Sequence, residues 1–153
     1  MTMVVIDTSV VVALADTHDK WHAQAVLLRD ALLSVGARPI YFDCVINEAI
    51  GVIGRRAEEQ KRSEQFERLL DELLIVIPPQ VITWVSAAGE RLLPDILALC
   101  RRQRGKLNYH DALMALACRE LGVGVIVSFD RDFDNIVWLE RIFEPAGVAR
   151  LAP

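Results

Sequence analysis

The sequence predicts an α/β fold, in which a mainly parallel central sheet of four or five strands lies between layers of helices as a three-layer sandwich. Short runs rich in valine and isoleucine alternate along the chain with longer segments of helical periodicity. Strands alternating with helices predict helical crossovers, which join parallel strands. With 153 residues the chain has the length of one domain, and we expect a single domain over residues 1–153.

The expected strands are short and apolar. Residues 3–6 form a β-branched run without helical period, which is typical of a buried strand. Residues 39–42 are the expected second strand, and residues 75–77, which two prolines close, are the expected third. Residues 123–128 are the fourth, and residues 136–139 are a candidate fifth strand.

Helical segments fill the intervals between these strands. Thr8 or Ser9 is a suitable N-cap for the first helix, Asp43 for the third and Asn108 for the last. The pattern is helical again from residue 80, and a break or kink is expected near Pro94, because proline lacks the backbone donor that a helix interior needs. The expected helices cover about residues 9–15, 19–34, 43–56, 57–74, 94–104 and 109–121.

Four carboxylates stand at positions where the surrounding sequence is apolar. Asp7 and Asp130 each directly follow an expected strand, while Glu48 and Asp111 lie on the apolar stripes of expected helices. Ligands of open parallel sheets bind outside the carboxyl ends of the strands, so Asp7 and Asp130 should reach the same edge. Buried carboxylates repel one another and are costly without a partner, and a divalent cation would compensate for them.

Each acid also has a purely structural interpretation. Asp7 could form an Asx turn or cap a helix, and Glu48 could reach toward Arg55 two turns further on. Asp111, three residues after the expected cap Asn108, could merely favour the helix dipole. One common site explains all of these acids more simply than several unrelated structural roles.

The fourth acidic position is less sharply defined than the others. Asp130 could cap a short turn over residues 131–133, and Asp132 and Asp134 are alternative acids nearby. A site built only of carboxylates suits Mg²⁺ or Mn²⁺ rather than zinc. Because Mg²⁺ takes part of its ligand shell from water and phosphate, the expected chemistry is hydrolysis of phosphodiester bonds.

The segments that carry these acids resemble the four acidic motifs of PIN-domain nucleases, and the likeness is to VapC-type toxins of toxin–antitoxin pairs. The resemblance extends in order and spacing from residue 1 to about residue 138, and its motifs cover residues 6–10, 47–48, 110–115 and 128–133. It implies a PIN-like fold and a Mg²⁺- or Mn²⁺-dependent ribonuclease. It also implies a homodimer that a small antitoxin holds inactive by covering the site.

The resemblance assigns roles residue by residue. It makes Asp7, Glu48, Asp111 and Asp130 the catalytic, metal-binding acids, with Asp132 or Asp134 able to share or replace the role of Asp130. Thr8 or Ser9 and Ser128 would be hydroxyls that orient these acids.

Basic residues are the candidates for contact with the RNA backbone, since the net charge of −4 gives no overall attraction for nucleic acid. A cluster just before the Asp111 helix is the first candidate, although basic residues also suit a helix C-terminus for its dipole alone. It consists of Arg101, Arg102, Arg104 and Lys106. A second patch, which is equally explicable as a solvated face, consists of Arg55, Arg56, Lys61 and Arg62.

Other features point to location and partners. Three unclustered cysteines suit buried thiols in a reducing cytoplasm, and no apolar run is long enough for a membrane span. The N-terminus lacks the pattern of a signal peptide, so a cytoplasmic protein is expected. A hydrophobic content of 53% suggests an apolar surface reserved for a partner. The three tryptophans are expected in the core or an interface rather than as a platform for bases.

The leading functional hypothesis is therefore a toxin-type endoribonuclease. A housekeeping RNA-processing PIN nuclease and a degenerate PIN fold that only binds a partner are the alternatives. A phosphoacceptor receiver domain also gathers acids at the end of a parallel sheet, but it needs a lysine after the last strand. Arg131 is the only cation near that position, which argues against a receiver.

Overall fold

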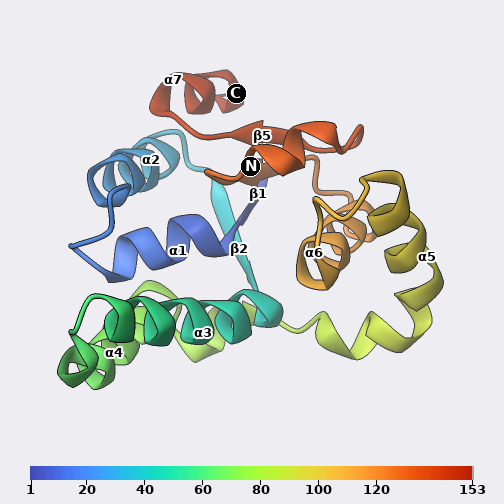
Figure 1. Cartoon of the computed structure of the whole chain (residues 1–153). Coiled ribbons are helices and arrows are strands. Elements are labelled where there is room, and N and C mark those ends of the chain that lie inside the picture. Colours follow the sequence, from blue (N-terminus) through green and yellow to red (C-terminus); the bar gives the residue numbers. More distant parts are fainter. Residues whose placement is uncertain (153) are drawn as a thin grey trace.

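The computed structural model describes residues 1–152 and contains a five-stranded sheet in which every neighbouring pair is parallel (Figure 1). The strand order is β3-β2-β1-β4-β5. The strands are β1 (Met3–Ile6), β2 (Arg38–Phe42), β3 (Ile82–Thr83), β4 (Val125–Val127) and β5 (Glu140–Ile142). The predicted α/β sandwich with a parallel central sheet is thus confirmed.

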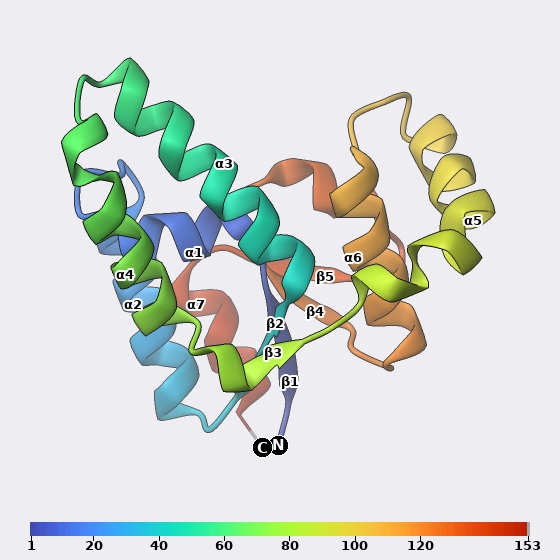
Figure 2. The same ribbon diagram turned by 90° about the horizontal axis from the view of Figure 1, so that it is seen from below.

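Helices cover both faces of this sheet. On one side lie α1, α2 and α4, and on the other lie α5 and α6, while α3 runs along the end of the sheet at which α1 begins (Figures 1 and 2). The α-helices within residues 1–152 are α1 (Thr8–Ala15), α2 (His22–Ser34), α3 (Asp43–Glu59), α4 (Phe66–Val76), α5 (Gly89–Arg102), α6 (Tyr109–Glu120) and α7 (Pro145–Val148). None of the described helices is long and apolar enough to cross a membrane.

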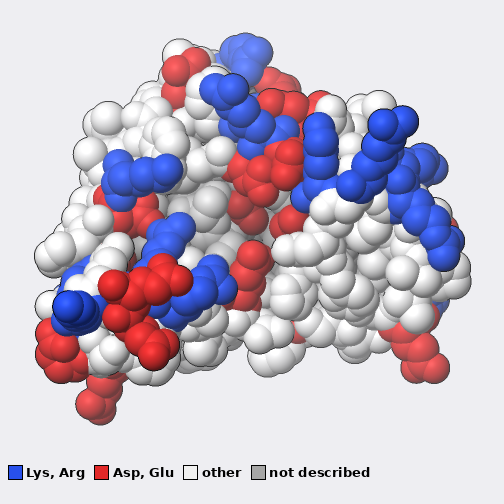
Figure 3. Space-filling model, in the orientation of Figure 1, with Lys and Arg blue, Asp and Glu red and all other residues white. Residues whose placement is uncertain are grey.

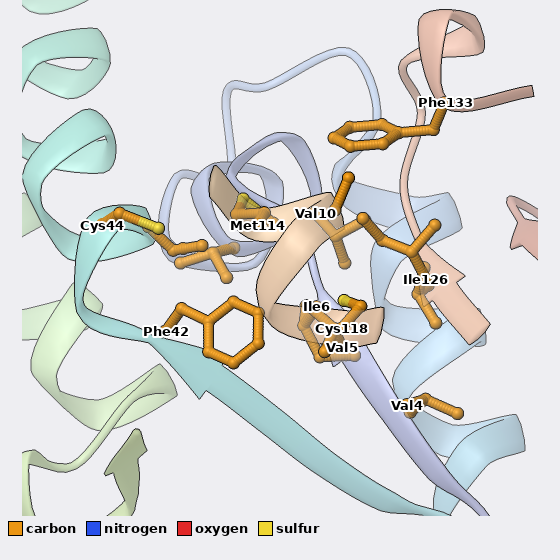
Figure 4. Close-up of a cluster of buried hydrophobic side chains, with 14 of the residues drawn as sticks. Val4, Val5, Ile6, Val10, Phe42, Cys44, Met114, Cys118, Ile126 and Phe133 are labelled. Carbon is orange, nitrogen blue, oxygen red and sulfur yellow. The ribbon is translucent and has the colours of Figure 1, made fainter. Parts of the chain in front are cut away.

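The core fills both sides of the sheet, with buried residues from α1, α2 and α4 on one face and from α6 on the other. Val4, Val5 and Ile6 of β1 are buried, and Met114 and Cys118 of α6 lie close to them (Figure 4). Every residue of α6 from position 111 to 118 is buried, so this helix is held firmly beside the sheet. Cys44 and Cys118 are buried and Cys100 is partly buried, and all are free thiols, as predicted for cysteines without disulfides.

The third expected strand is wrong. Residues 75–77 belong to the end of α4 and its C-cap, and the strand at this place in the sheet is Ile82–Thr83, after the two prolines. Leu69, Leu73 and Ile77 form a buried stripe at helical spacing, whereas Ile75 is exposed. The helical stripe therefore outweighs the β propensity of the short run.

The fifth strand is also displaced, to Glu140–Ile142. Residues 136–139 form a connection instead, in which Ile136 and Leu139 are buried but Val137 is 94% exposed. The indole nitrogen of Trp138 donates to the carbonyl of Ala115 at 2.8 Å. These contacts hold the segment against α6, and the strand begins only after them.

Several helix boundaries differ from those expected. The helix predicted at 57–74 is split, because α3 continues to Glu59 and a left-handed Lys61 precedes α4. Helix α5 begins at Gly89, before Pro94, which lies inside it. Asp43 is the first residue of α3 rather than its N-cap, and its carboxylate accepts hydrogen bonds from the backbone of Val85 and Ser86.

The sheet has a topological switch point between β1 and β4. The chain moves outward from β1 through β2 to β3, then returns to add β4 and β5 on the other side. In the register of β1 and β4, Val5 faces Ile126 and Ile6 faces Val127. Asp7 and Ser128 therefore leave the sheet side by side, at the place where open parallel sheets bind ligands.

Candidate metal centre

A polar pocket of about 290 Å³ opens at the switch point, and all four predicted acids line it. Asp7 follows β1, Glu48 comes from α3, Asp111 from α6 and Asp130 from the segment after β4. Acidic side chains gather in the middle of this face of the molecule, with basic side chains on both flanks (Figure 3). The fold thus brings together residues that are far apart in the sequence.

Asp7 is fixed by hydroxyl groups at the start of α1. It is the N-cap of this helix, in place of the expected Thr8 or Ser9. Its Oδ2 atom accepts hydrogen bonds from the Ser9 hydroxyl at 2.7 Å, the Ser9 amide at 3.3 Å and the Ser128 hydroxyl at 2.7 Å. Burial raises the pKa of Asp7, and these hydrogen bonds oppose that rise.

The two serines also hold the segment that follows β4. The Ser9 hydroxyl accepts a hydrogen bond from the Phe129 amide at 3.1 Å. The Ser128 hydroxyl accepts one from the Asp130 amide at 2.9 Å. Each serine therefore connects the ends of β1 and β4, which fixes the relative positions of Asp7 and Asp130.

Glu48 is oriented by Thr8 rather than by the basic residue considered for it. The Thr8 hydroxyl donates to Glu48 Oε2 at 3.0 Å, and no hydrogen bond joins Glu48 to Arg55 within the described residues. Thr8 is buried and begins α1, which packs against α3. The contact between these two helices therefore aims Glu48 into the pocket.

Asp111 has both a structural contact and a place in the pocket. It forms a capping box with Asn108: its amide donates to Asn108 Oδ1 at 2.9 Å, and its Oδ2 accepts from the Asn108 amide at 3.4 Å. Burial, followed by the charges of Asp7, Glu48 and Asp130, raises the pKa of Asp111 to about 7. The pocket therefore has more negative charge than its own residues neutralise.

Of the three acids that follow β4, Asp130 is the one that lines the pocket. It caps the 3-10 turn Arg131–Asn135 through a hydrogen bond from the Asp132 amide to its Oδ1 at 2.9 Å. Asp132 and Asp134 do not line the pocket. Asp134 is paired with Arg141 at 2.7 and 3.0 Å, and this hydrogen bonding lowers the pKa of Asp134.

The basic cluster before α6 contributes one residue to the pocket, Lys106. Arg101, Arg102 and Arg104 are exposed outside it. Arg56, which the sequence offered only as part of a second patch, also lines the pocket. The signal was present in the sequence, because the α3 lining residues Glu48, Val52 and Arg56 recur at intervals of four along one helix face.

The histidines lie outside the pocket lining. His110 Nε2 is 3.5 Å from the side-chain nitrogen Nδ2 of Asn47, and His22 Nδ1 is 2.7 Å from the carbonyl oxygen of Ala13. His18 lies beside Asp16. Apart from Val12 and Val52, the acidic pocket is therefore lined by residues whose side-chain oxygens can bind a cation and by the two basic side chains, with no imidazole among them.

The oxygen donors fit a hard divalent cation. Among the residues described, no three His, Cys, Asp or Glu side chains are already gathered tightly enough to form a metal-binding group. Each acid hydrogen-bonds to the protein through one oxygen, namely Asp7 Oδ2, Glu48 Oε2, Asp111 Oδ2 and Asp130 Oδ1. The other oxygen of each is the one available to a cation such as Mg²⁺ or Mn²⁺.

The parallel sheet, the switch-point pocket and its four acids define an α/β protein with an acidic site. The family model of the PIN domain matches residues 4–139, and the chain belongs to this family. No curated protein matches the sequence.

Solved structures share the fold at low sequence identity. VapC20 of Mycobacterium tuberculosis, described as a toxin that cleaves the sarcin-ricin loop, is 21% identical with a TM-score of 0.66, over 89% of this chain and 98% of that one. VapBC2 from Rickettsia felis, bound to a DNA fragment from its promoter, gives 15% identity and a TM-score of 0.63, over 92% and 98% of the two chains. DNA-bound VapBC from Salmonella typhimurium is 14% identical with a TM-score of 0.63, over 93% of this chain and 98% of that one.

Proposed function

We propose that this chain is a divalent-metal-dependent endoribonuclease, and that it is the toxin of a toxin–antitoxin pair. The observation that carries the proposal is the convergence of four carboxylates, each with one oxygen held by the protein, in a pocket at the switch point of a PIN-domain sheet. The description of VapC20 as a toxin that cleaves the sarcin-ricin loop supports RNA as the substrate.

The acids Asp7, Glu48, Asp111 and Asp130 would hold Mg²⁺ or Mn²⁺. The bound cation would supply a water of lowered pKa and would neutralise charge on the phosphate during an in-line displacement. Ser9, Ser128 and Thr8 restrict the carboxylates to one orientation, so the site is arranged before substrate arrives. Lys106 and Arg56 supply positive charge at the pocket walls for the RNA backbone.

An antitoxin and a second copy of the chain are the proposed partners. Two of the structures with this fold are VapBC complexes, which supports an antitoxin. The protein also exposes large apolar side chains, including Trp84 at 76% and the pair Leu93 and Leu97, one turn apart on α5. Such a surface is typical of a protein interface, and we assign it to homodimer formation.

The experiment is incubation of total cellular RNA with the purified chain, free of antitoxin. Mg²⁺, Mn²⁺ and EDTA are compared, with Asp7→Asn as the inactive control. We expect discrete cuts that require the cation and disappear in the variant. Cuts that persist in EDTA would contradict the metal-dependent mechanism, and a wild-type protein that binds no Mn²⁺ and cuts nothing would favour a PIN fold that only binds a partner.

A further inference from the structure

A second hollow of about 280 Å³ adjoins the acidic pocket and shares one residue with it, Arg56. It lies between the segment that joins α1 to α2 and the C-terminal half of α3. Its lining residues are Asp16, His18, Asp19, Lys20, Arg56 and Gln60.

The charges of this hollow differ from those of the acidic pocket, because arginines neutralise both of its acids. Asp16 accepts two hydrogen bonds from Arg62, at 3.0 and 3.1 Å. Asp19 is paired with Arg56, and its side chain is only 4% exposed. The lining carries two acids and two bases, and Arg62, which pairs with Asp16 from outside the lining, adds a third base. Lys20 forms no salt bridge within residues 1–152, so its charge is the one left unpaired beside the negative pocket.

The walls of the hollow are fixed to the acidic pocket. Trp21 stacks on Phe129, with ring centroids 4.9 Å apart and planes 13° from parallel. Phe129 stands between Ser128 and Asp130, so the stack joins the α1–α2 segment to the residues that orient Asp7. The amide of Trp21 also donates to Asp19 Oδ1 at 2.8 Å, which holds the carboxylate that contacts Arg56.

Arg56 can contact Asp19 and a phosphate at the same time. It uses Nη1 for Asp19, whereas a guanidinium has five N–H donors in a planar fork. The side chain is 44% exposed and lines both cavities. An arginine held from behind by a buried carboxylate loses little freedom on binding, which favours a fixed phosphate contact.

We propose that this hollow binds the nucleotide of the RNA strand that is next to the one in the catalytic pocket. In this arrangement Arg56 binds the phosphate that joins these two nucleotides. This inference rests on the proposed ribonuclease function. A metal pocket rich in carboxylates attracts RNA poorly by itself, so the strand needs cationic anchors beside it. Arg56 and Lys20 provide such anchors in the hollow, and Lys106 provides one at the catalytic pocket.

The test measures binding of a labelled, mixed-sequence single-stranded RNA of about ten nucleotides. The parent is Asp111→Asn, which prevents cleavage, and anisotropy is recorded in Mg²⁺ at several salt concentrations. Arg56→Gln should weaken binding about tenfold. It should also reduce the salt slope, which is the slope of the logarithm of the binding constant against the logarithm of the salt concentration, by about one phosphate contact. Lys20→Gln, in the hollow alone, should weaken binding in the same direction by a smaller factor.

Arg55→Gln is the matched control, because Arg55 is the exposed neighbour in the same helix and lines neither cavity. We expect its affinity and salt slope to remain those of the parent. Arg56→Lys should restore most of the slope but only part of the affinity, since lysine keeps the charge and loses the planar fork. Equal effects of Arg55→Gln and Arg56→Gln would overturn the inference.

Two further outcomes are separated by design. A parent that binds no RNA would overturn the proposed function together with the subsite, whereas a parent that binds RNA equally well without Arg56 would overturn the subsite alone. Because Arg56→Gln leaves Asp19 without its partner, the double variant Asp19→Asn, Arg56→Gln is measured as well. It removes both charges and should show the same reduced slope while remaining folded by circular dichroism.

Discussion

The hydroxyl of Ser128 donates a buried hydrogen bond of 2.7 Å to Asp7 Oδ2, although the two residues are 121 positions apart. The parallel pairing of β1 with β4 makes this contact possible, because both strands end at the same edge of the sheet. The bond fixes one oxygen of Asp7, which lines the acidic pocket. It also ties the first acidic segment to the fourth through the Asp130 amide.

Replacing Ser128 by alanine should weaken the site without removing a carboxylate. Asp7 would lose a donor that opposes the effect of burial on its pKa, so this pKa should rise further. We expect cation affinity and cleavage to fall by about 10- to 100-fold. Mn²⁺ titration and single-turnover cleavage measure the two effects. Ser34→Ala, at the exposed end of α2, is the control, and an equal loss there would show that the effect is not local.

Asp111→Asn should stabilise the metal-free protein at high pH and abolish cleavage. The pKa of about 7 for Asp111 means that the folded chain binds a proton where the unfolded chain has already lost it. Wild-type stability in EDTA therefore rises as the pH falls from about 7 toward 4, and declines as the pH rises through 7. Asparagine removes the repulsion and keeps an acceptor for the Asn108 amide.

Urea unfolding in EDTA at two pH values checks this prediction. Above pH 8 the free energy of unfolding of the variant should exceed that of the wild type by on the order of a few kcal/mol, because folding raises the pKa of Asp111 from 3.8 to about 7. Near pH 4, close to the ordinary pKa of 3.8, the wild-type side chain takes up a proton in the unfolded chain as well, and the difference in the free energy of unfolding should become small. A variant that is less stable than the wild type at both values would mean that the capping role of Asp111 dominates.

Cation binding should weaken as the solution becomes more acidic. A carboxylate must be ionised to bind the metal, and protons compete for Asp111 below about pH 7. We expect the affinity for Mn²⁺ to fall by up to about tenfold per pH unit below this point, and to change little above pH 8. Calorimetric titration across this range measures the effect. An affinity that stays constant between pH 5 and 8 would exclude Asp111 as a ligand.

The fold was largely predictable because apolar runs and apolar stripes at helical spacing indicate directly which residues are buried. The strand expected at residues 75–77 failed since Ile77 completes the buried stripe of Leu69 and Leu73, and a run of three residues cannot show which period it follows. The strand pairing that places Asp7 beside Ser128 follows from the sheet order, which the local pattern does not contain.

The meeting of the four acids in one pocket was predictable because each of them interrupts an apolar pattern. Their structural interpretations were not true alternatives, since Asp7, Asp111 and Asp130 cap helical turns and line the pocket at once. Arg56 was harder to identify, because an exposed arginine on a charged helix is ordinary. Its significance depends on Asp19, which comes from another element.

The most direct test of the catalytic pocket compares Asp130→Asn with Asp132→Asn in single-turnover cleavage of a target RNA in Mn²⁺. The two acids lie on the same turn, but only Asp130 lines the pocket. We expect Asp130→Asn to lower the rate by at least about 100-fold, while Asp132→Asn stays within about threefold of wild type. Equal rates for the two variants, or a greater loss with Asp132→Asn, would contradict a metal site formed by the four pocket acids.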